Sequence, residues 1–384
     1  MARQLSLLAL LLLGFLLSES PALPCSLCSG QRSKTLREDA SLAKLILCGT
    51  LANSRLVVDK DGLSAGGTTD LEIKAVLKTD PILAGRNVVE LPRYVPTDPK
   101  NPPKFIVFAD VFNGRLDPYR GIPIQSPDLL DYVKGAMTLG GRDSTKALLY
   151  FFNYLDHRDP TIADDAFLEF AKAGDQEIGQ LVGRLDAQRL RKWVQDPQTP
   201  SPRLNLYGFL LGACGEDRDT ELLRFMVKSP NESHQAALSG LLSGYIYLRQ
   251  KEGWELACAV LQEPRQPFAR RVAVLGALRF YHAWRPRESG EPILRCLDVL
   301  INQPDMADLA IEDLRRWQMW DLTGNVLAQF AKESHSAPIT RRAILRYGLS
   351  CPDPAARDFI ASQRKLNAGL VADVEESLQF EKQN

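Results

Sequence analysis

The feature that most constrains this chain is an amphipathic segment that recurs along its C-terminal two-thirds. In its clearest copy, 266–282 (QPFARRVAVLGALRFYH), Ala273 and Ala277 lie four residues apart on one helical face. Equivalent pairs, spaced 31 to 40 residues from one copy to the next, are Ala166 and Phe170, Leu206 and Leu210, Ala237 and Leu241, Ala310 and Leu314, and Ala343 and Tyr347. Because a repeat of this length cannot bury its own apolar face alone, the spacing predicts stacked supersecondary units.

Each repeat fits two helices. The expected first helices are 144–156, 178–194, 219–228, 254–262, 292–302 and 319–332. The expected second helices are 162–173, 203–214, 234–249, 267–283, 306–317 and 339–349. Proline or a polar capping residue stands at or near the start of most second helices: Pro160, Pro202, Ser233, Pro267, Pro304 and Pro338. Proline suits a first turn, since the amide that it lacks would have no partner there. A last helix, about 354–376, is expected to cap the stack.

Helix pairs of this length, with arginines in the first turn of the second helix (Arg270 and Arg271, Arg341 and Arg342), resemble HEAT-like repeats. The resemblance covers 144–376. It implies an α-solenoid of about six helix pairs, whose concave surface, often made of the second helices, binds a protein or peptide.

The N-terminus predicts export. A short basic start with Arg3 precedes the apolar run Leu5 to Leu17, which is too short to span a bilayer and is typical of a signal peptide. A small-x-small site suggests cleavage after Ala22, and no later stretch is long and apolar enough for a membrane helix. Residues 1–22 are therefore expected to be removed, leaving a periplasmic or extracellular protein with no integral membrane segment.

The charge balance argues against a nucleic-acid partner. Lys+Arg and Asp+Glu are both 47, whereas nucleic-acid binders usually carry a basic excess that neutralises phosphates.

Residues 23–122 predict a small β-rich domain. Residues 71–77 alternate apolar and charged positions, as in a half-buried strand, and strand-like runs also occupy 42–51, 88–91 and 105–112. Asn113-Gly114 predicts a hairpin in which 115–117 returns. Glycine-rich 61–68 and proline-rich 95–103 are expected to be connecting loops, and 123–143 is expected to be a linker before the helices. Five short strands suggest a small barrel or sandwich.

The order of these elements resembles the netrin-like, OB-type barrels of secreted proteins. The resemblance rests on a cysteine pair, then Leu47-Cys48-Gly49-Thr50, Val76-Leu77-Lys78 and Phe105-Ile106-Val107-Phe108. The chain has fewer cysteines than that family, so no inhibitory or binding residue carries over. The whole domain order resembles that of uncharacterised secreted bacterial proteins.

Cys25, Cys28 and Cys48 are disulfide candidates, since disulfides persist outside the cytoplasm. The favoured interpretation is a structural bridge that ties the mature N-terminus to the first strand through Cys48, with the pairing left open. A thiol redox or metal-binding role at Cys25 and Cys28 is the alternative, although no βαβ pattern or second ligand pair supports it. The later cysteines, Cys214, Cys258, Cys296 and Cys351, fall on or beside apolar faces and are expected to pack in the core as free thiols.

No sequence motif indicates catalysis, a cofactor or a metal. His157 stands between Asp156 and Asp159, which is best explained as a polar turn between helices, and Asp164-Asp165 is expected to stand near a helix N-terminus. Neither H-E-x-x-H, G-x-S-x-G, a P-loop nor a dinucleotide fingerprint occurs. An enzyme of unrecognised type at the domain junction stays open as an alternative.

Trp317 and Trp320, next to Arg315 and Arg316, are the candidate partner-binding residues. Aromatic residues with arginine are favoured at protein-binding hot spots, but tryptophans also fill gaps between stacked repeats. Asn231 heads a formal glycosylation acceptor. Together these observations predict an exported, non-enzymatic protein-binding or scaffolding protein, with a β domain (23–122), a linker (123–143), a helical array (144–376) and a short tail (377–384).

Overall fold

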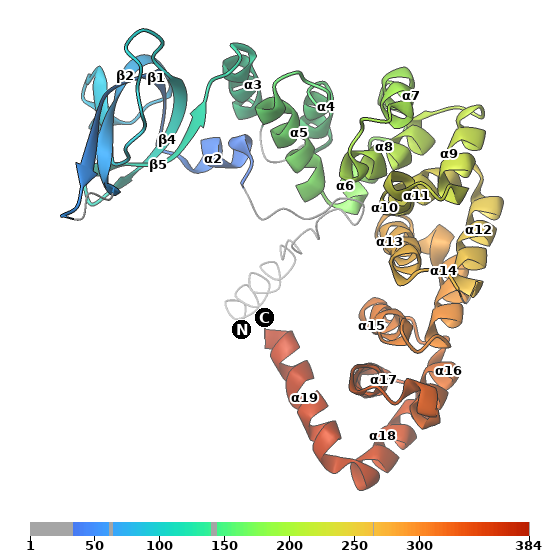
Figure 1. The fold of residues 1–384 in the computed structure, drawn as a ribbon. Helices are drawn as coiled ribbons and strands as arrows, with labels where there is room; N and C mark the ends of the chain where they lie inside the picture. The colour runs from blue at the N-terminus through green and yellow to red at the C-terminus, as the bar shows by residue number, and fades with distance from the viewer. Residues whose placement is uncertain (1–33, 61–63, 140–143, 264, 384) are drawn as a thin grey trace, which may run out of the picture. The chain divides into compact units, whose positions relative to one another are not determined.

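The computed structural model describes residues 34–60, 64–139, 144–263 and 265–383 (Figure 1). The chain divides into two compact units, the first ending at Ala173 and the second beginning at Gly174. A five-stranded antiparallel sheet near the N-terminus is followed by helices, as the alternating and the helical periodicities predict. The signal peptide, Cys25 and Cys28 lie outside the described residues.

The sheet has the strand order β3-β2-β1-β4-β5, so β1 is central. Its strands are β1 (Leu45–Val58), β2 (Ser64–Lys78), β3 (Val88–Leu91), β4 (Lys104–Phe112) and β5 (Arg115–Pro123). Residues 64–68 belong to β2, so the expected loop at 61–68 is wrong for its second half. Thr68, Gly67 and Gly66 pair with Arg55, Leu56 and Val57 of β1, and this pairing extends the hairpin beyond the apolar stretch.

The sheet curls around its own apolar core. Val89 of β3 and Leu116 of β5 pack in one cluster with residues of the three strands between them, although β3 and β5 are the two edge strands. Leu83, in the short helix η2 (Pro81–Leu83), belongs to the same cluster. Gly49 allows the close approach of β1 to β2, because a Cβ there would lie 2.0 Å from the carbonyl oxygen of Glu72.

In the described part of the first unit, α-helices join the sheet and the short helix η2. They are α2 (Leu36–Leu42), α3 (Asp128–Met137), α4 (Ser144–Phe152) and α5 (Pro160–Lys172). The middle of the expected linker at 123–143 therefore forms α3, and the division between units falls at Ala173 instead. Sequence reasoning missed α2, which begins with a capping box in which Thr35 and Glu38 each bond the other's backbone amide.

Hydrogen bonds and ion pairs hold α2 between α5 and the sheet. Asp165 accepts hydrogen bonds from the amide of Leu36 and the hydroxyl of Tyr132, each at 2.7 Å. Arg37 of α2 donates hydrogen bonds to both carboxylate oxygens of Glu169 of α5. On the sheet side, further contacts are Arg120 with Asp39, and Lys78 with the carbonyl of Ala40 at 2.9 Å. These contacts explain why α5 belongs with the sheet.

The second unit is helical throughout its described part. It comprises α6 (Asp175–Gly179), α7 (Ala187–Gln195), α8 (Ser201–Cys214), α9 (Asp219–Lys228), α10 (Glu232–Ala236), α11 (Leu238–Leu248), α12 (Gln250–Gln262), α13 (Phe268–Trp284), α14 (Pro286–Ile301), α15 (Ala307–Trp317), α16 (Thr323–Ala328), the short helices η3 (Gln329–Ala331) and η4 (Glu333–His335), α17 (Pro338–Ser350), α18 (Pro354–Leu366) and α19 (Ala368–Gln383). Asn367 divides the expected last helix into α18 and α19. No helix in the described part of the chain is long and apolar enough to span a bilayer.

The helices of the second unit pack in two rows, and neighbours within a row are not consecutive in the chain. In one row α11 packs against α8 and α13, and α15 packs against α17; in the other, α14 packs against α12 and α16, and α16 against α18. Polar contacts join residues about one period apart. Arg271 donates to Asp305 at 2.9 Å, Arg279 donates to Asp313 at 2.8 Å, and the ring of His335 lies 3.0 Å from the carbonyl oxygen of Ile301. Each of these three contacts joins residues that are 34 positions apart in the sequence.

Glycines bring α8 and α11 close together. A Cβ on Gly212 would lie 2.3 Å from the Cα of Gly244, and one on Gly240 would lie 1.6 Å from the carbonyl oxygen of Asn205. The side chain of Asn205 accepts a hydrogen bond from the Gly240 amide at 2.6 Å. Gly208 and Gly212, like Gly240 and Gly244, are four residues apart, so each pair lines one side of its helix.

Cys258 of α12 and Cys296 of α14 form a disulfide, with their Cα atoms 5.2 Å apart. The expectation that both are free core thiols is therefore wrong. The two residues are 38 positions apart, and the packing of α12 against α14 brings them together. Cys214 and Cys351 have no disulfide partner among the described residues, and Cys351 is buried as expected.

Candidate functional site

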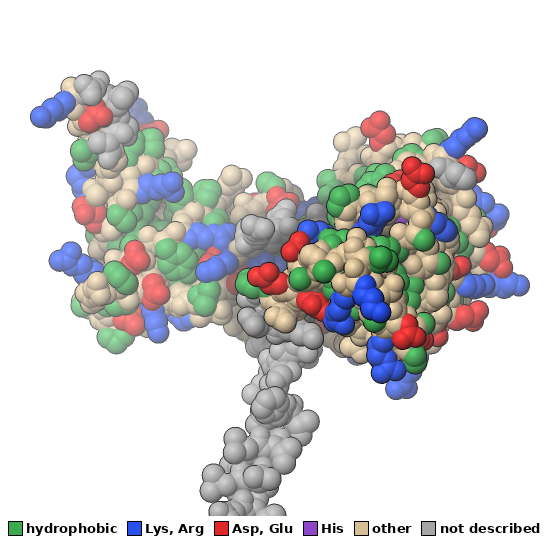
Figure 2. Space-filling model, turned by 90° about the horizontal axis from the view of Figure 1, so that it is seen from below, with side chains coloured by type: hydrophobic (Ala, Val, Ile, Leu, Met, Phe, Trp, Pro, Cys, Tyr) green, Lys and Arg blue, Asp and Glu red, His purple; other side chains and the backbone are tan. Residues whose placement is uncertain are grey.

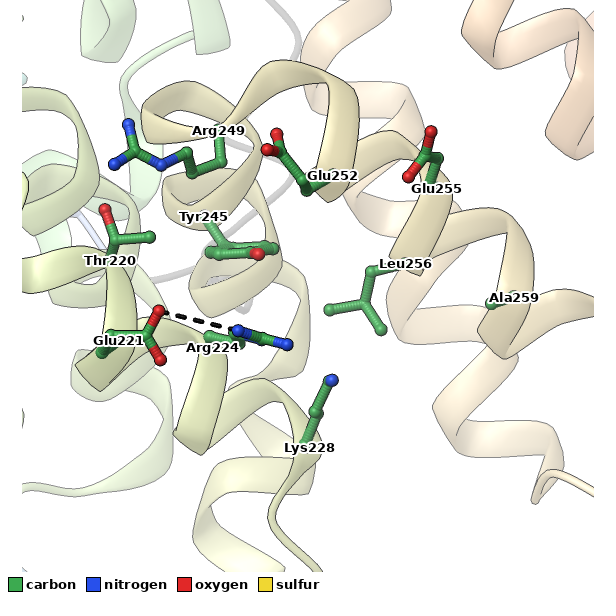
Figure 3. Close-up of a pocket in the computed structure, with 10 residues that line it drawn as sticks. All are labelled: Thr220, Glu221, Arg224, Lys228, Tyr245, Arg249, Glu252, Glu255, Leu256 and Ala259. Atoms are coloured by element: carbon green, nitrogen blue, oxygen red, sulfur yellow. Dashed lines mark ion pairs between the residues drawn. The ribbon is translucent and has the colours of Figure 1, made fainter.

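In the second unit, a groove of about 430 Å³ lies between α9 and α12, with α11 beneath it (Figure 3). Its volume lies within the range of about 300–1,000 Å³ that is typical of ligand pockets. The lining residues are Thr220, Glu221, Arg224, Lys228, Tyr245, Arg249, Glu252, Glu255, Leu256 and Ala259. We refer to it as the α9–α12 groove.

The α9 wall is predominantly basic. Leu223, Met226 and Val227 are buried, which leaves Arg224 and Lys228, four residues apart, exposed on the groove side (Figure 3). Arg224 is paired only loosely, with its guanidinium nitrogen 3.6 Å from the carboxylate of Glu221. Both cations are thus available to a ligand.

An ion pair anchors the start of α9. Arg191 of α7 donates two hydrogen bonds to the carboxylate of Asp219, at 2.6 and 2.8 Å. Burial alone would raise the pKa of Asp219, but the hydrogen bonds from Arg191 and from the Glu216 amide outweigh it and lower that pKa. The carboxylate therefore stays charged, and the α9 wall is fixed relative to α7.

The α12 wall carries acidic and apolar side chains. Glu252 and Glu255 are exposed, have no ion-pair partner among the described residues, and lie on the same side of α12 as Leu256 (Figure 3). Only Arg249 separates α11 from α12, and it pairs with Asp217 at 3.1 Å. This tight connection fixes the α12 wall relative to α11.

Tyr245 of α11 forms the floor between the two walls and is only 5% exposed. Figure 3 shows its ring in the space between the α9 and α12 side chains, with Leu256 extending toward the α9 wall. An apolar floor between walls of opposite charge suits a polypeptide segment better than a small neutral molecule, because a peptide presents charges of both signs around an apolar side chain.

Within the described ranges, no three His, Cys, Asp or Glu side chains lie close enough together to hold a metal ion. Outside the groove, acidic and basic side chains are interspersed over the face of the helical unit that Figure 2 shows. In the groove, the two cations of α9, Arg224 and Lys228, outnumber the single carboxylate Glu221 on that wall, whereas α12 contributes the carboxylates Glu252 and Glu255.

The residues predicted for partner binding lie further along the unit. Trp317 stacks on the ring of His282, with centroids 4.1 Å apart, and Trp320 meets Tyr347 edge-on at 5.0 Å. Both tryptophans are half-buried. Each therefore packs against a neighbouring helix, which the gap-filling interpretation anticipates, and each keeps some exposed surface.

The two arginines next to these tryptophans, Arg315 and Arg316, differ in their exposure and in their ion pairs. Arg315 has a side chain that is 9% exposed and pairs with Glu312 and with Glu381 of α19, each at 2.9 Å, while Arg346 of α17 pairs with the same two carboxylates. Arg316 is 64% exposed. Only Arg316 of this pair is open to a partner without breaking a close ion pair.

The other sequence candidates are placed as follows. Cys48 is buried on β1, where desolvation raises the pKa of its thiol to about 11. Its pairing with Cys25 or Cys28 stays a prediction. His157 lies in the turn between α4 and α5, 3.3 Å from Asp128, and its ring accepts the amide of Asp159 at 3.0 Å.

Asp165 differs from its expected position near a helix start. Because α5 begins at Pro160, Asp165 lies in its second turn, where burial raises the pKa of the carboxyl to about 6. The Tyr132 hydroxyl and the Leu36 amide counter that rise. Nothing in the local sequence of α5 signals this burial, because α2 and α3 supply both partners.

Sequence reasoning also missed the α9–α12 groove. The spacing of Arg224 and Lys228 on one side of a helix, and of Glu252 with Glu255 and Leu256 on another, is visible in the sequence. Each of these patterns looks like an ordinary solvated helical face. Only the placement of the two helices beside each other shows that the two faces line one groove. Comparison of the chain with protein-family models, curated proteins and solved structures finds no match.

Proposed function

We propose that this chain is an exported, non-enzymatic binding protein whose helical unit is a HEAT-like array, and that the α9–α12 groove holds a segment of a protein partner. The observation that carries the proposal is the groove itself, in which a buried tyrosine lies between a basic wall and an acidic wall. The two-row packing of helices at the sequence period supports the HEAT-like assignment.

Export is supported by two independent observations. The N-terminal apolar run is typical of a signal peptide. The Cys258–Cys296 disulfide suits an oxidising compartment, where such bonds persist. The curled five-stranded sheet supports an OB-type, netrin-like assignment for the first unit, because its two edge strands share one core.

The charges of the groove define the partner segment. An acidic side chain of the segment would face Arg224 and Lys228, and a basic one would face Glu252 and Glu255. An apolar side chain between them would cover Tyr245. Arginine or tryptophan in the partner would suit this arrangement, since such residues dominate protein-binding hot spots.

Affinity capture from the exported fraction tests the proposal. The purified chain is cross-linked to its partners, which are identified by mass spectrometry, and the capture is repeated with an Arg224→Glu/Lys228→Glu variant. Arg357→Glu, a charge reversal at an exposed site on α18, is the matched control. We expect the control to retain a partner that the double variant loses.

Two results would count against the groove. One is the recovery of no specific partner with the unaltered chain, which would contradict the binding role altogether. The other is a partner that the groove variant retains. In the second case a Trp317→Ala/Trp320→Ala variant decides whether the late helices form the binding surface instead.

A further inference from the structure

The first unit contains a cavity of about 230 Å³ between the two edges of the curled sheet. Residues from β1, β4 and β5 line it, together with the stretch at the end of β3 and after it: Leu51, Leu91, Pro92, Arg93, Val95, Phe105, Val107, Pro118, Tyr119, Arg120 and Gly121. It lies on the same side of the sheet as the apolar core, because Leu51, Leu91 and Val107 belong to both. We refer to it as the sheet-edge cavity.

A glycine leaves this cavity unfilled. Gly121 pairs with Val107, whose side chain points into the core, so position 121 faces the same way. A Cβ there would lie 3.4 Å from Cδ1 of Phe105 and would meet no other atom closer than 3.8 Å. The φ angle of Gly121 lies outside the left-handed region, so the backbone tolerates a side chain at this position. A larger residue at 121 would extend into the cavity.

The cavity floor is apolar. Leu51 and Val107 are almost fully buried, and Val95 and Phe105 are half-buried. The amide of Val95 donates to the Thr69 hydroxyl at 2.9 Å, which holds the loop after β3 against the sheet. The floor is therefore formed in advance of any ligand, as in most small-molecule sites.

The charged part of the lining is cationic. It contains Arg93 and Arg120 but no carboxylate. Arg120 is already bonded to Asp39 and, at 3.0 Å, to the carbonyl of Lys34. Arg93 is exposed, and none of the described residues forms an ion pair with it. One guanidinium is thus available beside an apolar floor.

We propose that the sheet-edge cavity binds a small amphipathic carboxylate, with the hydrocarbon part on the floor formed by Leu51, Val95, Phe105 and Val107 and the carboxylate on Arg93. The cavity is smaller than the roughly 300–1,000 Å³ of drug-sized sites, which favours a short chain or a single ring. Guanidinium groups match carboxylates in geometry as well as in charge. This site lies in the other unit from the α9–α12 groove and does not depend on it.

Calorimetric titration of the purified chain with octanoate, well below its micellar concentration, tests the proposal. We expect saturable binding of one octanoate per chain, with a negative heat-capacity change because apolar surface is buried. Octanol and octylammonium, which have the same hydrocarbon chain, are expected to bind at least several-fold more weakly. Equal binding of octanol would remove the role of Arg93, and the absence of saturable octanoate binding would overturn the site.

Variants separate the two halves of the site. Gly121→Leu fills the cavity and is expected to weaken octanoate binding at least tenfold; Gly121→Ala, which fills less of it, provides a milder test if the leucine variant does not fold. Arg93→Gln should weaken binding about two- to fivefold, as for other exposed ion pairs. Arg115→Gln, on β5 outside the cavity, is the matched control and should bind normally. Unchanged binding in both Gly121 variants would place octanoate elsewhere and refute the proposal.

Discussion

Replacing Gly240 with alanine tests the close packing of α8 and α11. The new Cβ would lie 1.6 Å from the carbonyl oxygen of Asn205 and 2.5 Å from its carbonyl carbon. Carbon–oxygen contacts between neighbouring backbones are normally about 3.3–3.6 Å, so the helices would have to separate by roughly 1–2 Å. No side-chain rotation can relieve this clash, because the nearest atoms belong to the backbone.

Three terms set the expected loss of stability. Overpacking a well-ordered core costs about 1–3 kcal/mol. Separation of the helices would also break the buried hydrogen bond from the Gly240 amide to Asn205, at a cost of about 1–3 kcal/mol. Against these two costs, alanine stabilises a helix by about 0.5–1 kcal/mol relative to glycine, because its helix propensity is better. The free energy of unfolding of the helical unit should therefore fall by about 2–4 kcal/mol.

Thermal and urea unfolding, followed by circular dichroism and calorimetry, measure this loss. For a unit of this size it corresponds to a decrease in Tm of roughly 5–15 °C. Gly290→Ala on α14 is the matched control, because beyond its own stretch of helix backbone no heavy atom lies within 4 Å of its Cβ position, and it should be neutral or slightly stabilising. If Gly240→Ala were as stable as Gly290→Ala, the close contact between α8 and α11 would be refuted.

Two further predictions concern the disulfide and the buried carboxyl. Replacing Cys258 and Cys296 with serine, or reducing the bond, should lower the free energy of unfolding by about 2–4 kcal/mol, because the bond closes a loop of 38 residues; equal urea midpoints with and without reductant would contradict this. Asp165 has its pKa raised to about 6 in the folded chain from an ordinary value of 3.8, so it binds its proton more tightly when folded. Its contribution to stability is therefore greatest below about pH 4 and decreases by about 3 kcal/mol in total as the pH rises through 6. Asp165→Asn should remove this pH dependence of the free energy of unfolding. Identical pH profiles of unfolding for the two proteins would show that Asp165 is not buried in this way.

Local patterns in the sequence determine most element positions. The expected strand at 88–91 and the expected helix at 219–228 match β3 and α9, and the strand expected at 105–112 differs from β4 by one residue. Proline predicts the start of α17 at Pro338. These features depend on neighbours two to four residues away, because strand and helix periodicities are set over that range.

The cysteines and the buried carboxyl show what the sequence leaves open. Cys258 and Cys296 look like two core residues on separate helices, and only the packing of α12 against α14 makes them a pair. Asp165 looks like a carboxylate that favours a helix start, and becomes buried because α2 and α3 pack over it. In each case the partner belongs to another helix.

The α9–α12 groove and the sheet-edge cavity depend on tertiary structure for the same reason. The sequence contains the charges of Arg224 and Glu252 and the missing side chain of Gly121. It does not contain the distance between two helices or the curl of a sheet, because these follow from how side chains interlock across elements far apart in the chain. The sequence by itself thus determined the local elements and their period, and the packing between elements decided which side chains share a site.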